Sequence, residues 1–385
     1  MADQFSETSV TSWGKRIAGA FVGIIFGIGL FIGSFFLLSW NEGRSVRRIK
    51  TLAEGRDLVV SVDSQNVDPT NENKLVHSSG LANTDETLKD AYFGIEQNAL
   101  KLRRVVEMYQ WEQSSEKKTE KKLGGSEETT TVYTYKKVWS EKQIKSSDFK
   151  KPEGHKNPNA MPYKSQTWTA QQVQMGAFSL TSPFISKIDQ FNSYPLSEEN
   201  FQNADDAVKA NFKLENGMYY SGKDSNEPEI GDLQIQYKII TPSVVSAIGQ
   251  QRGANLTSYT TKNGQIDLLQ YGNVTADSMF AKAEQENTLF TWLIRLGGCA
   301  MMWIGLILML GPVKVLGDIV PLIGNLLGAG IALIAGLVAI ALSFVTIAVA
   351  WIAYRPILGG ALLIVAAATT FFGYKTIHKK ALKPI

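Results

Sequence analysis

Histidine and cysteine, the side chains that most often bind metals or act as nucleophiles, are scarce in this chain. The histidines are His77, His155 and His378, and the single cysteine is Cys299. The sequence contains no His-Glu-x-x-His motif, no cysteine pair and no glycine-rich phosphate loop followed by lysine. We therefore predict no metal site, no cofactor and no intramolecular disulfide, and we expect His77 to be a hydrogen-bonded strand residue.

One serine and one lysine have a spacing that is found in some hydrolases. Ser114 and Lys117 lie inside residues 112–131, a segment rich in Glu, Lys, Ser, Thr and Gly. Such a segment buries too little apolar surface to offset its ordering entropy, so we predict a flexible loop. A nucleophile and its base need a rigid setting, and the acidic residues show no spacing typical of an acid and base pair. We predict that the protein is not an enzyme.

The chain that must position these side chains concentrates its apolar residues in two regions, 17–40 and 291–374. The first is twenty-four residues without a charge, long enough to cross a hydrocarbon core of about 30 Å. It exceeds the apolar core of a signal peptide and has no cleavage site, so we predict a retained transmembrane helix. The net charge of +3 is too small to indicate a nucleic-acid partner.

Five glycines repeat at helical spacing along this first helix. Small residues let two helix backbones approach closely in a membrane. We therefore predict a packing face, either for another helix of the same chain or for a second copy of it. The glycines are Gly19, Gly23, Gly27, Gly29 and Gly33.

Tryptophan and arginine flank the apolar stretches. Tryptophan prefers the headgroup zone of a bilayer, and arginine can pair with lipid phosphates there. We predict that these residues mark the membrane interface. They are Trp40, Arg44, Arg47, Arg48, Trp292, Arg295 and Arg355.

Residues 41–290 form a large polar domain in which strands outnumber helices. Phe201, Ala204, Val208 and Phe212 fall on one face of a predicted helix over 197–215, with Ser197 as its N-cap. The expected fold class is α+β, with this β-rich mixed extramembrane domain inserted between the first and second of four transmembrane helices. Alternating or β-branched runs predict strands at 58–62, 105–111, 132–139, 166–175, 233–240, 244–250 and 265–271.

Three more transmembrane helices are predicted within residues 291–374. The second span, about 292–312, continues a helix that begins near Thr275, and the third lies at about 324–351. The fourth runs from Pro356 to Tyr374 and is followed by a basic tail at 375–385. Four spans place both termini on one side, and the basic residues near them favour the cytoplasm. We therefore expect residues 1–16 to be a cytoplasmic tail and the large domain to be periplasmic or lumenal.

Several short stretches, in this order along most of the chain, resemble the transmembrane protein 43 (LUMA) family. Each stretch alone is a weak signal, but their shared order is specific. They are NEGRSV at 41–46, LAEG at 52–55, LVHSSG at 75–80, VEMYQW at 106–111, GDL at 231–233 and YRP at 354–356.

The resemblance implies four spans, a large domain between the first and second, and a scaffold role in the membrane. For an animal chain it implies a location in the endoplasmic reticulum and inner nuclear membrane. It also implies association with further copies of the same protein, with emerin and with lamin. For a bacterial chain it implies the cytoplasmic membrane without those partners. The resemblance supplies no catalytic residue.

Two classes of function remain after this reading. We favour a multi-pass membrane scaffold that self-associates in the lipid bilayer and organises other membrane proteins through its extramembrane domain. The alternative is a transporter or channel, or a lipid-binding membrane protein. The predicted spans contain no acidic residue and only Asn325, Arg295 and Arg355 as strongly polar groups, which disfavours conduction because ion pathways usually carry charge within the membrane.

Overall fold

A computed structural model describes residues 3–355 of the chain, which fall into two compact units. The polar unit comprises the N-terminal residues up to Thr8 together with Ala53–Lys118 and Thr130–Lys282. The helical unit comprises Ser9–Leu52, Thr119–Thr129 and the chain from Ala283 onward. The predicted fourth span, 356–374, and the basic tail, 375–385, lie outside the described residues.

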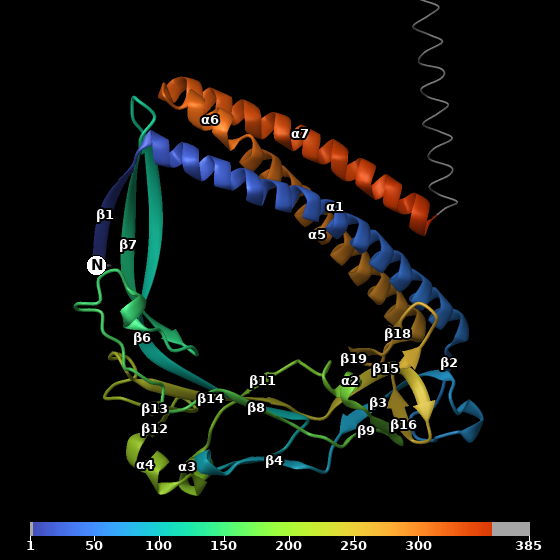
Figure 1. The fold of residues 1–385 in the computed structure, drawn as a ribbon. Helices are drawn as coiled ribbons and strands as arrows, with labels where there is room; N and C mark the ends of the chain where they lie inside the picture. The colour runs from blue at the N-terminus through green and yellow to red at the C-terminus, as the bar shows by residue number, and fades with distance from the viewer. Residues whose placement is uncertain (1–2, 356–385) are drawn as a thin grey trace, which may run out of the picture. The chain divides into compact units, whose positions relative to one another are not determined.

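Three helices of the structure are long and apolar enough to cross a membrane, α1, α5 and α7 (Figure 1). Helix α5 runs without a break from the polar sequence near Thr275 into the apolar stretch, as predicted. The short helix α6, which begins with Gly311 and Pro312, separates α5 from α7. The described helices are α1 Trp13–Leu58, α2 Ser182–Ile185, α3 Glu198–Asn203, α4 Asp206–Asn211, α5 Ala276–Met309, α6 Gly311–Gly317 and α7 Pro321–Tyr354.

Helix α1 does not end at Trp40, where the predicted membrane helix ended. It continues without interruption to Leu58. The sequence from 41 to 58 has no proline and contains four arginines, two leucines and two glutamates, which are good helix formers. The prediction considered only the apolar run, whereas backbone propensity extends the helix by eighteen residues beyond it.

The polar unit is built on two large sheets, of which the smaller is mixed (Figure 1). The larger has the order β1-β7-β6-β14-β13-β12, with β11 beside β14 and β8 beside β6, and the smaller has the order β19-β15-β16-β10-β9-β3-β2. The strands are β1 Asp3–Thr11, β2 Val60–Ser61, β3 Leu75–Asn83, β4 Thr87–Asp90, β5 Ile95–Asn98, β6 Lys101–Lys121, β7 Glu127–Ser140, β8 Gln166–Thr169, β9 Val173–Met175, β10 Phe178–Leu180, β11 Asn192–Tyr194, β12 Lys213–Glu215, β13 Met218–Ser221, β14 Leu233–Ile240, β15 Ser243–Arg252, β16 Asn255–Thr257, β17 Tyr259–Thr260, β18 Gln265–Ile266 and β19 Leu268–Tyr271.

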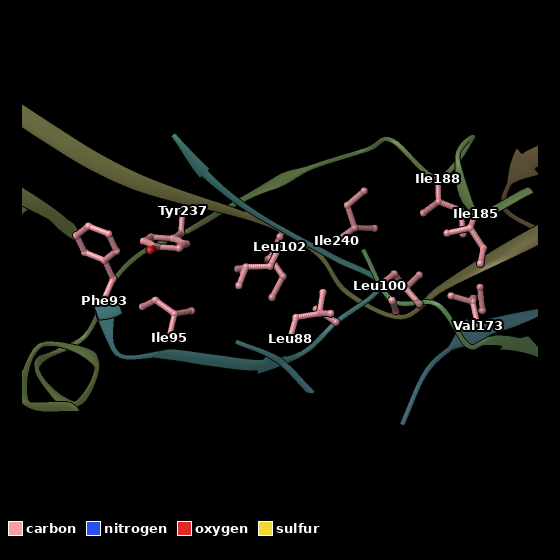
Figure 2. Close-up of a cluster of buried hydrophobic side chains, with 14 of the residues drawn as sticks. Leu88, Phe93, Ile95, Leu100, Leu102, Val173, Ile185, Ile188, Tyr237 and Ile240 are labelled. Atoms are coloured by element: carbon pink, nitrogen blue, oxygen red, sulfur yellow. The ribbon is translucent and has the colours of Figure 1, made fainter. Parts of the chain in front are cut away.

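One hydrophobic core fills the polar unit. Inward residues of β6 and β14 alternate with outward ones, so that Leu102 and Ile240 lie beside Ile95 and Leu88 of the β4–β5 hairpin (Figure 2). The ring of Tyr237 is buried and belongs to this core. Because each strand buries one face, the alternation that predicted β14 also fixes its register against β6.

The predicted helix over 197–215 is two short helices instead of one. Ser197 caps α3 in a capping box with Asn200, and Asp205 then caps α4 by accepting a hydrogen bond from Ala207 N at 2.9 Å. Ala204 between them is extended, because the Asp205 side chain offers the backbone an alternative to a continuous helix. Of the four residues predicted to share a face, Ala204, Val208 and Phe212 are buried, and Phe201 is partly buried against the core.

The segment 112–131, predicted to be the flexible tip of a hairpin, is the end of the β6–β7 hairpin and consists mostly of strand. Strand β6 extends to Lys121, and β7 starts at Glu127. The turn is closed by Lys122 N donating to Ser126 O at 2.9 Å, and Thr119 and Thr129 pair across the strands at 3.1 Å. The composition argument counted apolar burial only, whereas ladder hydrogen bonds and cross-strand pairs stabilise this hairpin.

Residues 3–11, predicted to belong to a polar cytoplasmic tail, form strand β1 at the edge of the larger sheet. Phe5 stacks on Tyr133 at 6.1 Å between ring centroids, and Thr8 bonds to Thr130 at 3.2 Å. The residues up to Thr8 therefore belong to the polar unit. The predicted placement of the tail and the large domain on opposite sides of the membrane stays a prediction.

The pairing of β1 with β7 predicts that the N-terminal strand and the polar domain are exposed on the same side of the membrane. In a Cys299→Ser background, Ser6→Cys and Asn226→Cys are each labelled with a membrane-impermeant maleimide in sealed vesicles of one orientation. Both positions are exposed, so we expect both to react, or both to be protected until detergent is added. Reaction of only one position would show that β1 does not join this sheet in the membrane.

Candidate functional site: buried ion pairs among the long helices

Helices α1 and α5 approach most closely at two glycines. A Cβ atom at Gly27 would lie 2.7 Å from the Gly305 carbonyl oxygen, and one at Gly305 would lie 2.8 Å from the Gly27 carbonyl oxygen. Neither position therefore tolerates a side chain without moving a backbone. Nearby, Leu38 is fully buried against Gly298 and Met302.

The predicted glycine face divides into two groups. Gly23, Gly27 and Gly33 lie against Leu308, Gly305 and Met301 of α5, respectively. At Gly19 and Gly29, by contrast, no described residue lies within 4 Å of an added Cβ. The structure thus uses part of the predicted face within the chain and leaves the other part uncovered by residues 3–355.

A buried carboxylate joins all three long helices just beyond this crossing. Glu42 of α1 is fully buried and accepts Arg295 Nε at 2.7 Å on Oε1 and Arg295 Nη2 at 2.8 Å on Oε2. Trp351 of α7 donates its indole N–H to Glu42 Oε2 at 2.7 Å. The Arg295 guanidinium also lies 4.7 Å from the Trp292 ring centroid. We name Glu42, Arg295 and Trp351 the charge clamp.

A second polar group connects α1 and α5 half a turn further along α1. Arg44 donates to Asn287 Oδ1 at 2.9 Å and to Thr291 Oγ1 at 3.0 Å. Asn41 in turn donates to the Thr291 carbonyl at 3.0 Å. In the described part of this group, Arg44 Nε alone has no hydrogen-bond partner. We name Asn41, Arg44, Asn287 and Thr291 the amide cluster.

Two arginines predicted to lie at the membrane interface have protein partners in this structure. Arg295 pairs with Glu42, and Arg44 bonds to Asn287 and Thr291. A bidentate carboxylate is a strong partner for a guanidinium. The position of both arginines at a membrane interface stays a prediction. Trp40 and Trp292 remain about half exposed, at 51% and 53%, and their position at a membrane interface stays a prediction.

The opposite end of the helical unit has its own buried charge. Asp318, between α6 and α7, accepts Lys121 Nζ at 2.6 Å and also bonds to Arg16. Lys121 further donates to Asn325 Oδ1 at 2.8 Å, and Arg16 pairs with Glu127 at 2.7 Å. Burial alone would raise the pKa of Asp318, but the hydrogen bonds from Lys121 and Arg16 outweigh it and hold the pKa below the usual 3.8. We name this group the Asp318 latch.

The two histidines of the polar unit have structural partners. His77, on β3, bonds through Nε2 to the Val274 carbonyl at 2.8 Å, as expected for a strand residue. His155 stacks on Tyr135 at 3.8 Å and pairs with Asp3 at 3.0 Å. The sequence alone assigned no role to His155. In the structure, its pair with Asp3 connects β1 to the rest of the polar domain.

A second buried group in the polar unit surrounds Asp90. It accepts Tyr237 Oη at 2.6 Å and Arg104 Nη1 at 2.5 Å. Burial, followed by the neighbouring Asp90 carboxylate, raises the pKa of Tyr237 far above its usual range. The phenol therefore stays protonated and acts as a hydrogen-bond donor. Its partners are already engaged with one another, which leaves no free base or nucleophile in this group.

Sequence reasoning missed the α5 side of the helical site. Gly298 and Gly305 are seven residues apart and therefore lie on one helical face, and Asn287 and Thr291 are four apart on another. These spacings were available as signals for a packing face and a polar face. The role of Glu42 carried no such signal, because in the sequence it lies outside the apolar run.

Removing one partner of the charge clamp should destabilise the helical unit strongly. Glu42→Gln leaves the Arg295 guanidinium without its anion, and breaking a buried pair in this way costs about 3–5 kcal/mol. Thermal unfolding in nanodiscs should show a midpoint several degrees lower than that of the wild type. Arg47→Gln, at an exposed position one turn away on α1, is the control and should change stability by less than about 0.5 kcal/mol.

The double variant Glu42→Gln, Arg295→Gln should lose less stability than the sum of the two single variants, because neither charge is then left unpaired. Strict additivity of the two effects would contradict a direct pair.

The Asp318 latch should hold over the physiological pH range and open only in acid. Since the folded pKa lies below the usual 3.8, the stabilisation is complete above the unfolded pKa and is lost as pH falls through the folded value. Hydrogen exchange of residues 119–129, corrected for the intrinsic pH dependence, should be constant between about pH 7 and about pH 5. Protection should fall below about pH 4. Asp318→Asn should lack that transition, and a transition near neutral pH would implicate a different group.

Comparisons with known proteins agree with this architecture. The family model described as transmembrane protein 43 matches residues 108–356. Transmembrane protein 43 of Mus musculus is 35% identical over 89% of this chain and 87% of its own length, and that of Homo sapiens is 36% identical with the same coverage. The transmembrane protein 43 homolog of Drosophila melanogaster is 31% identical over 89% of this chain and 92% of its own length. No solved structure matches the chain. The chain belongs to the transmembrane protein 43 family.

Proposed function

We propose that this chain is a multi-pass membrane scaffold that self-associates in the bilayer and organises a membrane protein complex through its extramembrane domain. The observation that carries the proposal is the charge clamp. Ion pathways keep ionisable groups facing water or a cavity, whereas Glu42 is fully buried and accepts three hydrogen bonds from protein. In this proposal, the Glu42 carboxylate serves to join helices.

The polar residue at the start of α7 supports the same conclusion. Asn325 was the group on which a transport pathway would most depend. Its Oδ1 accepts Lys121 Nζ in the Asp318 latch at 2.8 Å, so it has a structural partner. A transporter or channel remains the less favoured alternative. The names of the relatives describe a membrane protein and state no catalytic activity, which is consistent with the proposal of a non-enzymatic role.

The surface proposed for self-association is the uncovered part of the α1 glycine face. Gly29 has no described residue within 4 Å of an added Cβ, and Ile25, Ile32 and Phe36 along the same helix are 72%, 50% and 72% exposed. A second copy could approach closely there, because small residues allow backbone contact and the neighbouring apolar side chains can pack. Gly27, in contrast, is already occupied by α5.

The proposed location follows the organism. In a eukaryotic cell we propose the endoplasmic reticulum and inner nuclear membrane, with emerin and lamin as partners only in animals. In a bacterium we propose the cytoplasmic membrane. The three apolar helices support membrane insertion, and the sidedness of the polar domain is decided by the labelling experiment above.

Crosslinking in native membranes tests the scaffold proposal. We expect dimers or larger species of the wild type, and a decrease of about threefold in Gly29→Leu, because a bulky side chain keeps the backbones apart. Gly14→Leu, at an equally open glycine outside the apolar run, is the matched control and should crosslink like the wild type. Monomers alone, with no partner protein, would contradict the proposal, as would liposome ion flux that Asn325→Ala abolishes.

A further inference from the structure

Helices α5 and α7 enclose a groove with a cavity volume of about 280 Å³. Its walls are almost entirely apolar and aromatic, with Cys299 at its base, and we name it the α5–α7 groove. The side chains that matter for its function are Trp292, Cys299, Ile340, Phe344, Ile347 and Trp351.

The few polar groups in the wall of the groove already have partners. Arg295 is held by Glu42 in the charge clamp, and the Trp351 indole donates to the same carboxylate. Ser343 directs its hydroxyl to the Met302 sulfur at 3.8 Å. A ligand would therefore find no hydrogen-bonding group to satisfy, and a polar molecule would lose its hydration without compensation. The chemistry of the groove fits a hydrocarbon.

The dimensions of the groove favour an acyl chain over a helix. Ile340 and Trp351 are eleven residues apart, which corresponds to about 16 Å along α7. This is about half the thickness of a hydrocarbon core of about 30 Å, the depth of one leaflet. A helix about 10 Å across would fill the whole volume with less than one turn. A single extended chain has the right length and width.

One end of the groove has the character of a membrane interface. Trp292 and Trp351 lie there, and the Arg355 guanidinium is 5.6 Å from the Trp351 ring centroid. Among residues 3–355 Arg355 has no ion pair, unlike Arg295, whose charge is neutralised by Glu42. A positive charge next to the mouth of a hydrocarbon groove is complementary to the phosphate of a lipid headgroup.

We propose that the α5–α7 groove binds one acyl chain of a phospholipid whose phosphate is held by Arg355. The chain fills the space between Trp351 and Ile340, and the headgroup stays at the interface. Bound lipid then covers the apolar wall between α5 and α7, beside the charge clamp that connects both helices to α1. The site would tie the helical unit to one leaflet of the bilayer.

A photoreactive phospholipid tests this site in the full-length protein. Phosphatidylcholine with a diazirine in the middle of one acyl chain is added in trace amounts to phosphatidylcholine nanodiscs that contain the protein. After illumination, lipid adducts are mapped by mass spectrometry. We expect them to concentrate on the α5 peptide around Cys299 and on the α7 peptide from 340 to 347, above the level at exposed apolar positions such as Leu333.

Groove-filling variants provide the matched comparison. Ile347→Trp should reduce the adduct at the Cys299 peptide by more than about fivefold, because the indole occupies the space of the chain. Ile334→Trp makes the same change at a position on α7 that is 59% exposed and outside the groove, and it should leave the adduct unchanged. Reading the adduct on α5 keeps the mutated helix out of the measurement.

The headgroup contact is tested separately with Arg355→Gln. This variant should reduce labelling by the phospholipid probe but not by a diacylglycerol probe that carries the same diazirine chain and no phosphate. Equal loss with both probes would overturn the role of Arg355. Adducts spread evenly over exposed apolar residues, or a Cys299 adduct unchanged by Ile347→Trp, would overturn the groove, as would chemical crosslinks joining groove residues to 356–374 or to a second protein in place of lipid.

Discussion

The helical unit depends on one ion pair between α1 and α5. Glu42 and Arg295 meet through two hydrogen bonds of 2.7 and 2.8 Å, and the carboxylate is fully buried. A buried charge without its partner is expensive, because the attraction that offsets desolvation is lost while the desolvation remains. The pair thus tolerates few arrangements of α1 against α5, and the indole of Trp351 extends the same constraint to α7.

The glycine contacts and the charge clamp both depend on close packing of α1 against α5. A guanidinium reaches a carboxylate on a neighbouring helix only when the two backbones are close, and at Gly27 and Gly305 they are close enough to exclude a Cβ atom. Leu38 then fills the space against Gly298 between this crossing and the clamp. Close backbone contact gains dispersion energy in a bilayer, where apolar burial alone does not favour helix association.

The pairing of charged side chains within the protein affects what the surfaces of the long helices can bind. Glu42, Arg295, Asp318 and Lys121 all pair within the protein, and the exposed positions along the apolar stretches of the long helices are mainly apolar. Such surfaces are suited to other helices and to lipid. The polar unit is equally self-contained at its buried groups, where Asp90, Arg104 and Tyr237 satisfy one another.

The sequence by itself determined the features that depend on the neighbours of a residue along the chain. Alternation predicted β14, the unbroken helical pattern predicted α5, and apolar length predicted the first and third spans. Cap residues were read correctly at Ser197, yet the competing cap at Asp205 divided the predicted helix. The family was also recognisable from short ordered motifs.

Tertiary structure alone decided the features that depend on residues far apart in the chain. Glu42 and Arg295 are 253 residues apart, and no local pattern indicates that a carboxylate two residues after a tryptophan will be buried. The order of the 112–131 hairpin and the capture of residues 3–11 as a strand arise from ladder hydrogen bonds to partner strands, which composition does not measure. Pairing across such separations is set by the three-dimensional meeting of side chains and backbones, and the energy that fixes it appears only once the fold has excluded water.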